Sequence, residues 1–159
     1  MWYNLYRRTY YMSINLIKLQ DKEINEIYKI KRISEQYVGL IEDVLEDYNK
    51  IYKDYSDLVG IYLNEKIIGL VVLTNKPLNG KYSFTDFLID EDYQHKGYGK
   101  QVTNKIIDYF KNMNESRIIK IEVFSENSIA IKCYEKCGFR ITKKCNWNNS
   151  FLEMEIDIN

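Results

Sequence analysis

Apolar positions recur along the chain with two different spacings, and each spacing predicts a different kind of element. The apolar runs 58–63 and 66–73 are separated only by Asn64 and Glu65, a spacing that predicts an antiparallel hairpin. Other short, β-branched runs predict strands at 14–19, 82–89, 118–124, 139–142 and 151–156. Apolar residues three or four positions apart predict helices at 21–31, 35–52, 99–113 and 128–137.

The order of these elements predicts a mixed α/β fold built on one central sheet. The antiparallel first part leads into a β-α-β unit formed by 82–89, 99–113 and 118–124. A crossover of that kind joins two parallel strands with a right-handed connection. No internal repeat or Pro/Gly/Ser-rich linker divides the chain. The 159 residues therefore predict one domain over 12–159, preceded by an N-terminal extension over 1–11.

The first eleven residues lack the features of a secretory signal. They hold neither the apolar stretch of about 7–15 residues nor the small-residue cleavage site that such a signal needs. No apolar run in the chain approaches the ~18 residues of a membrane-spanning helix. We therefore expect a cytoplasmic protein with reduced thiols and no membrane partner.

Charge and cysteine usage exclude several classes of function. Lys plus Arg and Asp plus Glu each number 23, so the chain lacks the cationic excess that a nucleic-acid backbone requires. His95 is the only histidine, and three cysteines without a CxxC pair supply neither a zinc site nor a disulfide framework. We expect no metal and no nucleic-acid partner, with Cys133 and Cys137 packed as small apolar side chains.

The segment 94–100, between a predicted strand and a predicted helix, has the composition of an anion-binding turn. Its two glycines permit positive φ and a close approach of a ligand to the backbone. Its amides converge near the positive end of the next helix, which suits a pyrophosphate. The residues concerned are Gln94, His95, Lys96, Gly97, Tyr98, Gly99 and Lys100. The alternative is an ordinary helix start with solvated lysines.

Two common phosphate-binding motifs do not fit this segment. A nucleotide P-loop requires Ser or Thr after its GK pair, where this chain has Gln101. A dinucleotide-binding turn requires a third glycine, where this chain has Val102. The antiparallel start of the chain also differs from the alternating strands and helices of a dinucleotide fold.

Two signatures resemble those of the GNAT acyltransferase superfamily. QHKGYG at 94–99 fits the pattern Q/R-x-x-G-x-G/A, and NSIAIKCYEKCGF at 127–139 fits N-x-x-A-x-x-x-Y-x-x-x-G-F. FLIDEDYQHKGYGK and SEQYV further resemble bacterial spermine/spermidine-type N-acetyltransferases. The fold implied is a GNAT-like acyl-CoA N-acyltransferase fold, with a central mixed sheet of six to seven strands flanked by about four helices.

The resemblance implies acetyl-CoA as co-substrate and implies which residues bind it. The pyrophosphate would lie on 94–100, Asn127 would bond a pantetheine amide, and Tyr134 would lie near the sulfur. His95 differs from the small or basic residue common at its position. The pantetheine arm would pair, as an added strand, with the backbone of Phe87, Leu88 and Ile89.

Acyl transfer also requires groups that stabilise charge and protonate the leaving group. A backbone N–H where the two parallel strands separate, that of Leu88, is the candidate donor to the carbonyl oxygen. The phenol of Tyr134 is the candidate acid that protonates the departing thiolate. The alternative for Tyr134 is a core aromatic without a chemical role.

A base must accept the proton of the attacking amine. Asp86 interrupts an apolar strand, on the face expected for Phe84 and Leu88, and a half-buried carboxylate there should have a raised pKa. The alternative is an edge carboxylate with a local hydrogen bond. Glu122 on the neighbouring strand is the second candidate.

The charge of the segment 35–49, within the predicted helix 35–52, bears on the acceptor. It has no basic residue, and Glu42 and Glu46 repel each other at i, i+4. A small polycation such as a polyamine would relieve that repulsion, although a solvated polar face is the alternative. Its acidic residues are Glu35, Glu42, Asp43, Glu46 and Asp47. The candidate substrate contacts are Glu35, Glu42, Asp86 and Glu122.

Two other functions remain open on the sequence. One keeps the chemistry but acetylates a peptide N-terminus or a lysine side chain. The other is a catalytically silent acyl-CoA sensor, which the segment 94–99 fits equally well; Tyr134 favours the enzyme. We also expect a homodimer.

Overall fold

The computed structural model describes residues 12–32, 37–145 and 150–159, and it confirms the mixed α/β class. The strands are β1 (Ile14–Lys18), β2 (Ser56–Leu63), β3 (Lys66–Thr74), β4 (Phe84–Ile89), β5 (Ile118–Phe124), β6 (Arg140–Cys145) and β7 (Phe151–Asp157). The helices are α1 (Ile41–Asp47), α2 (Tyr98–Met113) and α3 (Ser128–Lys136). Shorter helical turns are η1 (Ile24–Lys29), η2 (Tyr48–Tyr52) and η3 (Glu91–Tyr93).

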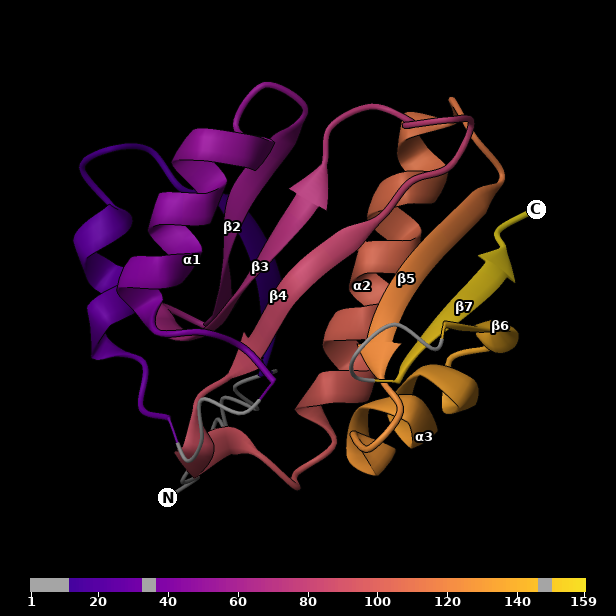
Figure 1. The fold of residues 1–159 in the computed structure, drawn as a ribbon. Coiled ribbons are helices and arrows are strands. Elements are labelled where there is room, and N and C mark those ends of the chain that lie inside the picture. The colour runs from indigo at the N-terminus through magenta and orange to yellow at the C-terminus, as the bar shows by residue number, and fades with distance from the viewer. Residues whose placement is uncertain (1–11, 33–36, 146–149) are drawn as a thin grey trace, which may run out of the picture.

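The strands form two sheets, which in the described residues are joined at Tyr82. The first sheet has the order β1-β2-β3-β4 and the second the order β5-β7-β6, and the strands within each are antiparallel. Tyr82 bridges in parallel to Ile119: its N–H donates to the Ile118 carbonyl and its carbonyl accepts from the Lys120 N–H, both at 2.9 Å. Beyond this bridge β4 and β5 diverge (Figure 1). The expected parallel pairing is present only at this bridge, and the expected strand 82–89 joins the first sheet only from Phe84 onward.

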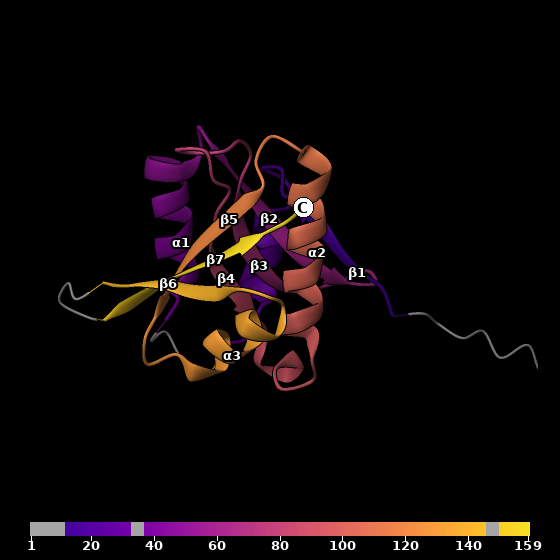
Figure 2. The ribbon, with the colours of Figure 1, turned by 90° about the vertical axis from the view of Figure 1, so that its right-hand side faces the viewer.

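Helices cover both faces of the sheets. In Figure 2, α1 lies on one side and α2 on the other. The apolar stripe of α2 is fully buried through Val102, Ile106 and Phe110, and the Tyr82 ring stacks on Phe110 with 4.6 Å between centroids. A second core cluster lies under α1 and η1. None of the described helices is long and apolar enough to cross a membrane.

The helix expected over 35–52 is shorter than the pattern indicates. Residues 33–36 lie outside the described residues, and α1 begins only at Ile41. The Asp43 carboxylate accepts the Leu40 N–H at 3.3 Å, which fixes the start of the helix there. After Asp47 the backbone widens into the π turn η2, which apolar spacing does not distinguish from a continuing helix. The helix expected over 21–31 is the single 3₁₀ segment η1.

A β-bulge interrupts β4 at Asp86. Leu70 of β3 pairs with Leu88 and Val72 pairs with Thr85, so two residues of β4 stand opposite one of β3. Asp86 adopts a left-handed conformation with φ of 51°. The extra residue reverses the alternation: Phe84 belongs to the core under α2, and Leu88 to the core under α1. The expectation that Phe84, Asp86 and Leu88 share one face is therefore wrong.

Candidate active site

The edge of β4 that faces β5 is unpaired between Phe84 and Ile89 in the described part of the chain. Asp90 donates its N–H to Ile68 of β3 at 2.7 Å, and Leu88 pairs with Leu70. Because alternate residues of a strand direct their N–H and C=O groups to opposite sides, Phe87 and Ile89 direct theirs toward the gap beside β5. The Ile89 carbonyl there accepts a hydrogen bond from Gln94 Nε2, so the groups left for a ligand are those of Phe87 and the Ile89 N–H. Such an edge can take up an extended ligand as an added strand.

The backbone N–H and C=O groups of Leu88 are directed away from this gap. A Cβ atom on Gly69 of β3 would lie 2.2 Å from the Leu88 carbonyl oxygen, so that oxygen points at β3. The N–H of a strand residue points the same way as its C=O. The geometry therefore does not favour the N–H of Leu88 as a donor toward the gap, and the neighbouring Phe87 N–H takes the suitable orientation.

The segment 94–97 forms a turn that ends at the first residues of α2. His95 (φ 59°) and Gly97 (φ 83°) are both left-handed, and Gly97 is the N-cap of α2. The first bond inside the helix runs from the Gln101 N–H to the Gly97 carbonyl at 3.3 Å. The amides before it, including those of Tyr98, Gly99 and Lys100, therefore point out of the helix end, where an anion binds favourably.

The two glycines of this turn act differently from what the pattern indicates. Gly97 has the expected positive φ, but Gly99 is an ordinary residue of α2, and the second positive φ belongs to His95. A Cβ on Gly99 would lie 3.5 Å from the Cys133 sulfur of α3, an ordinary contact.

Two polar side chains of the turn hold the turn itself. Gln94 donates through Nε2 to the Ile89 carbonyl at 2.8 Å. Lys96 donates through Nζ to the Asp92 carbonyl at 2.7 Å, and its ammonium lies 5.8 Å from the centre of the Tyr93 ring. His95 and Lys100 are exposed.

Asn127 caps α3 next to the end of β5. Its Oδ1 accepts the Ala130 N–H at 3.2 Å, and its own N–H donates to the Phe124 carbonyl at 2.9 Å. Within the residues that the structure describes, its Nδ2 group makes no hydrogen bond, so it can donate to a ligand amide.

Tyr134 lies in the core with its ring against β4. The centroids of Phe84 and Phe139 are each 5.8 Å from that of Tyr134, so the ring packs as a core aromatic. Burial, followed by the neighbouring Cys133 and Cys137, raises the pKa of the Tyr134 phenol well above its ordinary range. The hydroxyl makes no hydrogen bond to any described residue. It is thus protonated at neutral pH.

Asp86 lies within electrostatic range of the Asp47 carboxylate at the end of α1. Burial raises the pKa of Asp86, and the nearby charge of Asp47 at the end of α1 raises it further. The pKa of Tyr52 is raised first by burial, then by Asp86 and Asp47, and to a smaller extent by Glu122. We call Asp47, Tyr52, Asp86 and Glu122 the acidic cluster.

Two members of the acidic cluster, Asp47 and Tyr52, were not singled out from the sequence. Asp47 was one of several acidic residues in a predicted helix, and Tyr52 one of 15 tyrosines. Asp47 ends α1, and Tyr52 ends the π turn η2 that follows it, which apolar spacing does not reveal.

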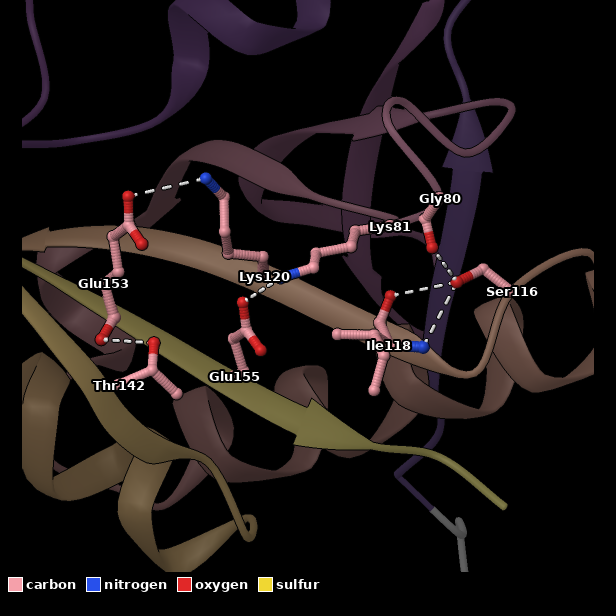
Figure 3. A network of polar contacts seen from close by, with 8 residues as sticks. All are labelled: Gly80, Lys81, Ser116, Ile118, Lys120, Thr142, Glu153 and Glu155. Carbon is pink, nitrogen blue, oxygen red and sulfur yellow. Dashed lines mark hydrogen bonds and ion pairs between the residues drawn. The ribbon is translucent and has the colours of Figure 1, made fainter.

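Glu122 is exposed on the outer face of β5, opposite Glu153 of β7. Glu153 is paired with Lys120 at 3.5 Å, and Lys81 reaches Glu155 on the same face (Figure 3). Glu122 has no ion pair with any described residue. It is therefore the member of this charge ladder that remains open to a cationic ligand.

The remaining acidic candidates are not brought to the cluster. Glu35 lies outside the described residues, and Glu42 is exposed on the first turn of α1. Glu46 forms an ion pair with Lys50 in η2. The expected stretch of uncompensated negative charge is therefore interrupted, because the helical segment extends to a lysine beyond position 49.

Cys133 and Cys137 lie at the contact of α2 and α3 as neutral thiols. Burial is the main reason that the pKa of Cys133 is raised and that of Cys137 rises to about 11. The described residues contain no group of three or more His, Cys, Asp or Glu side chains that could hold a metal ion.

Comparisons with known proteins point in one direction. Residues 22–139 match the acetyltransferase (GNAT) family. The spermine/spermidine N(1)-acetyltransferase of Bacillus subtilis (strain 168) is 27% identical over 146 residues, covering 86% of this chain and 94% of that protein.

Solved structures show the same fold. The spermidine N-acetyltransferase of Vibrio cholerae, in complex with CoA and spermine, superposes with a TM-score of 0.71 at 21% identity, covering 91% of this chain and 95% of that one. The aminoglycoside acetyltransferase AAC(6')-Ib, in complex with coenzyme A, gives a TM-score of 0.76 at 19% identity, covering 91% and 95%.

Proposed function

Because the chain belongs to the acetyltransferase (GNAT) family, we propose that it transfers the acetyl group of acetyl-CoA to a primary amine of a small polycation such as spermidine or spermine. The choice of a polycationic acceptor is supported by the acidic cluster, in which Asp86 lies in β4 and Glu122 in β5. The spermine/spermidine N(1)-acetyltransferase of Bacillus subtilis, similar over most of its length, supports the same class of acceptor.

The residues of the turn and of β4 fit coenzyme A. The amides at the start of α2 suit its pyrophosphate, and the free backbone groups of Phe87, with the Ile89 N–H, suit the amides of its pantetheine arm. Asn127 has an Nδ2 group to donate to that arm. Acetyl-CoA supplies a thioester-activated acetyl group at this place.

Three groups of the chain then perform the transfer, and two more hold the acceptor. Asp86, whose pKa is raised, accepts a proton from the incoming ammonium directly or through water. The Phe87 N–H, rather than that of Leu88, stabilises charge on the carbonyl oxygen. The neutral Tyr134 phenol donates a proton to the departing sulfur. Glu122 and Asp47 hold a second ammonium of the acceptor.

A panel of acceptors tests this function. Purified protein with acetyl-CoA is given spermidine, spermine, a short diamine, an aminoglycoside or a lysine peptide, and the release of free CoA thiol is followed. Spermidine and spermine should give the highest kcat/KM, and initial rates at varied acetyl-CoA should give intersecting lines, as direct attack in a ternary complex requires. Thiol release with the peptide alone, or with no amine, contradicts the proposal.

A further inference from the structure

Asp90, directly after β4, is a buried carboxylate whose oxygens are both bonded to backbone. Only 2% of the residue is exposed. Oδ1 accepts the Asp92 N–H and Oδ2 accepts the Lys31 N–H, each at 2.9 Å. A carboxylate that accepts backbone N–H groups makes bonds about twice as strong as neutral ones. Asp90 therefore holds two chain segments that are far apart in sequence.

The first of these segments is the beginning of the anion-binding turn. The bond to Asp92 caps η3, and the Tyr93 N–H donates to the Asp90 carbonyl at 2.9 Å. The Gln94 N–H continues the turn by donating to the Glu91 carbonyl at 3.3 Å. The path of the chain toward His95 and Gly97 thus starts from a backbone conformation that Asp90 fixes.

The second segment leads into α1. The Lys31 carbonyl accepts the Glu91 N–H at 3.0 Å, so Lys31 is held on both its donor and its acceptor side. Arg32 then donates through its guanidinium to the carbonyls of Val38 and Gly39, just before α1 begins. The entry to α1 is therefore linked to Asp90 through hydrogen bonds to Lys31 and from its chain neighbour Arg32.

We propose that Asp90 is a positioning residue that fixes the coenzyme A turn and the entry to α1 to one point, so that binding of coenzyme A also orders the residues around the start of α1. At its far end α1 carries Asp47, which acts on Asp86. A change at Asp90 therefore reaches both substrates, although the residue contacts neither. The acceptor part rests on the proposed function; the coenzyme part does not.

Two variants and one matched control separate this role from general stability. Asp90→Asn removes the charge and one of the two acceptors. Lys31→Pro removes the N–H that Asp90 accepts from this segment together with the lysine side chain, and Ile30, with φ −72° and ψ 123°, already has the backbone that a following proline requires. Lys31→Ala keeps that N–H and removes only the exposed ion pair with Asp92, which contributes little.

Calorimetric titration with free CoA and amide hydrogen exchange give the readouts, on full-length protein whose fold is checked by circular dichroism. Asp90→Asn should weaken CoA binding at least tenfold, and Lys31→Ala should stay within twofold of the wild type. In the wild type, CoA should slow exchange in peptides covering 37–47 as well as 90–101. In Lys31→Pro it should slow exchange only in 90–101.

The proposal is overturned if folded Asp90→Asn binds CoA as tightly as the wild type. The proposal is also overturned if CoA does not slow exchange in 37–47 of the wild type, or slows it equally in Lys31→Pro. If Asp90→Asn does not fold, the exchange result on Lys31→Pro decides. No acceptor amine is present in these measurements, so a protein that fails to acetylate polyamines still gives a decisive result here.

Discussion

Asp86 occupies a backbone conformation that aspartate tolerates better than most residues, at the bulge of β4. Its pKa is raised by burial and then by Asp47. Because the folded-state pKa is raised, protonated Asp86 contributes to the stability of the fold. This contribution is fully present below the unfolded pKa of about 4 and is lost as pH rises through the folded-state pKa. At neutral pH the ionised Asp86 therefore lowers the stability of the fold.

Asp86→Asn should separate activity from stability. Removing the base is expected to lower kcat by about 10²-fold or more, whereas the free energy of unfolding at pH 7 should rise. Chemical denaturation at pH 4 and pH 7 measures the second effect, which should shrink at the lower pH. Asp108→Asn on the exposed face of α2 makes the same charge change as a control. A less stable Asp86→Asn at pH 7 would contradict the assignment.

Tyr134→Phe isolates the role of the hydroxyl, because the ring contacts with Phe84 and Phe139 remain. We expect kcat to fall by about 10²-fold with the dissociation constant for CoA unchanged. Steady-state kinetics with spermidine and a CoA titration measure the two quantities. Equal turnover would leave Tyr134 as a core aromatic only.

At the scale of elements, prediction succeeds where a pattern depends on neighbours in sequence. The hairpin turn at Asn64 and Glu65 is present, with Asn64 left-handed at φ 55°. The helix expected over 99–113 matches α2 to within one residue. In both places turn chemistry or apolar period acts over a few residues, so the sequence carries the information locally.

The bulge of β4 and the start of α1 could not be predicted in this way. Residues 84–88 read as an apolar strand interrupted by Asp86, and only pairing with β3 shows that an extra residue is inserted. The start of α1 depends on the Asp43 cap rather than on the apolar period. The turn 94–100 can be predicted because its glycines are neighbours in sequence. The place of Asp47 and Tyr52 near Asp86 depends on the three-dimensional fold and therefore cannot be predicted.

Gly69→Ala tests how closely β3 holds the free edge of β4. The new Cβ would lie 2.2 Å from the Leu88 carbonyl oxygen, which is backbone and must move. We expect a loss of about 1–3 kcal/mol in unfolding free energy and weaker CoA binding, both measured on the purified variant. Gly99→Ala, whose Cβ meets only an ordinary contact at 3.5 Å, is the control for stability and should lose none. Unchanged CoA affinity in Gly69→Ala would show that β3 does not determine the position of the free edge of β4.

For the molecule as a whole, a net charge of zero conceals an uneven distribution of charge. The acidic cluster lies on the α1 side, whereas the coenzyme turn has exposed His95, Lys96 and Lys100. The family fold alone does not select the acceptor, because it is shared with a spermidine and an aminoglycoside acetyltransferase. We therefore propose that local charge recognises the acceptor.

Asp47→Asn should raise the KM for spermidine about three- to tenfold at low ionic strength, since a single charge near a protein surface contributes on the order of 1 kcal/mol. The KM for acetyl-CoA should not change. Added salt should reduce the difference between wild type and variant, because it screens the attraction. Asp108→Asn again serves as the control. An effect equal in both variants would show that only net charge matters.

Tyr82 is where the described strands of the two sheets exchange main-chain hydrogen bonds, and it is fully buried against Phe110 of α2. The angle between the sheets is therefore maintained by side-chain packing under α2 rather than by a continuous ladder. A co-substrate lying along the edge of β4 would supply the hydrogen-bond partners that β5 does not offer to β4. The loaded enzyme would then be a more continuous sheet than the empty one, and the free energy of ligand uptake would add directly to that of folding.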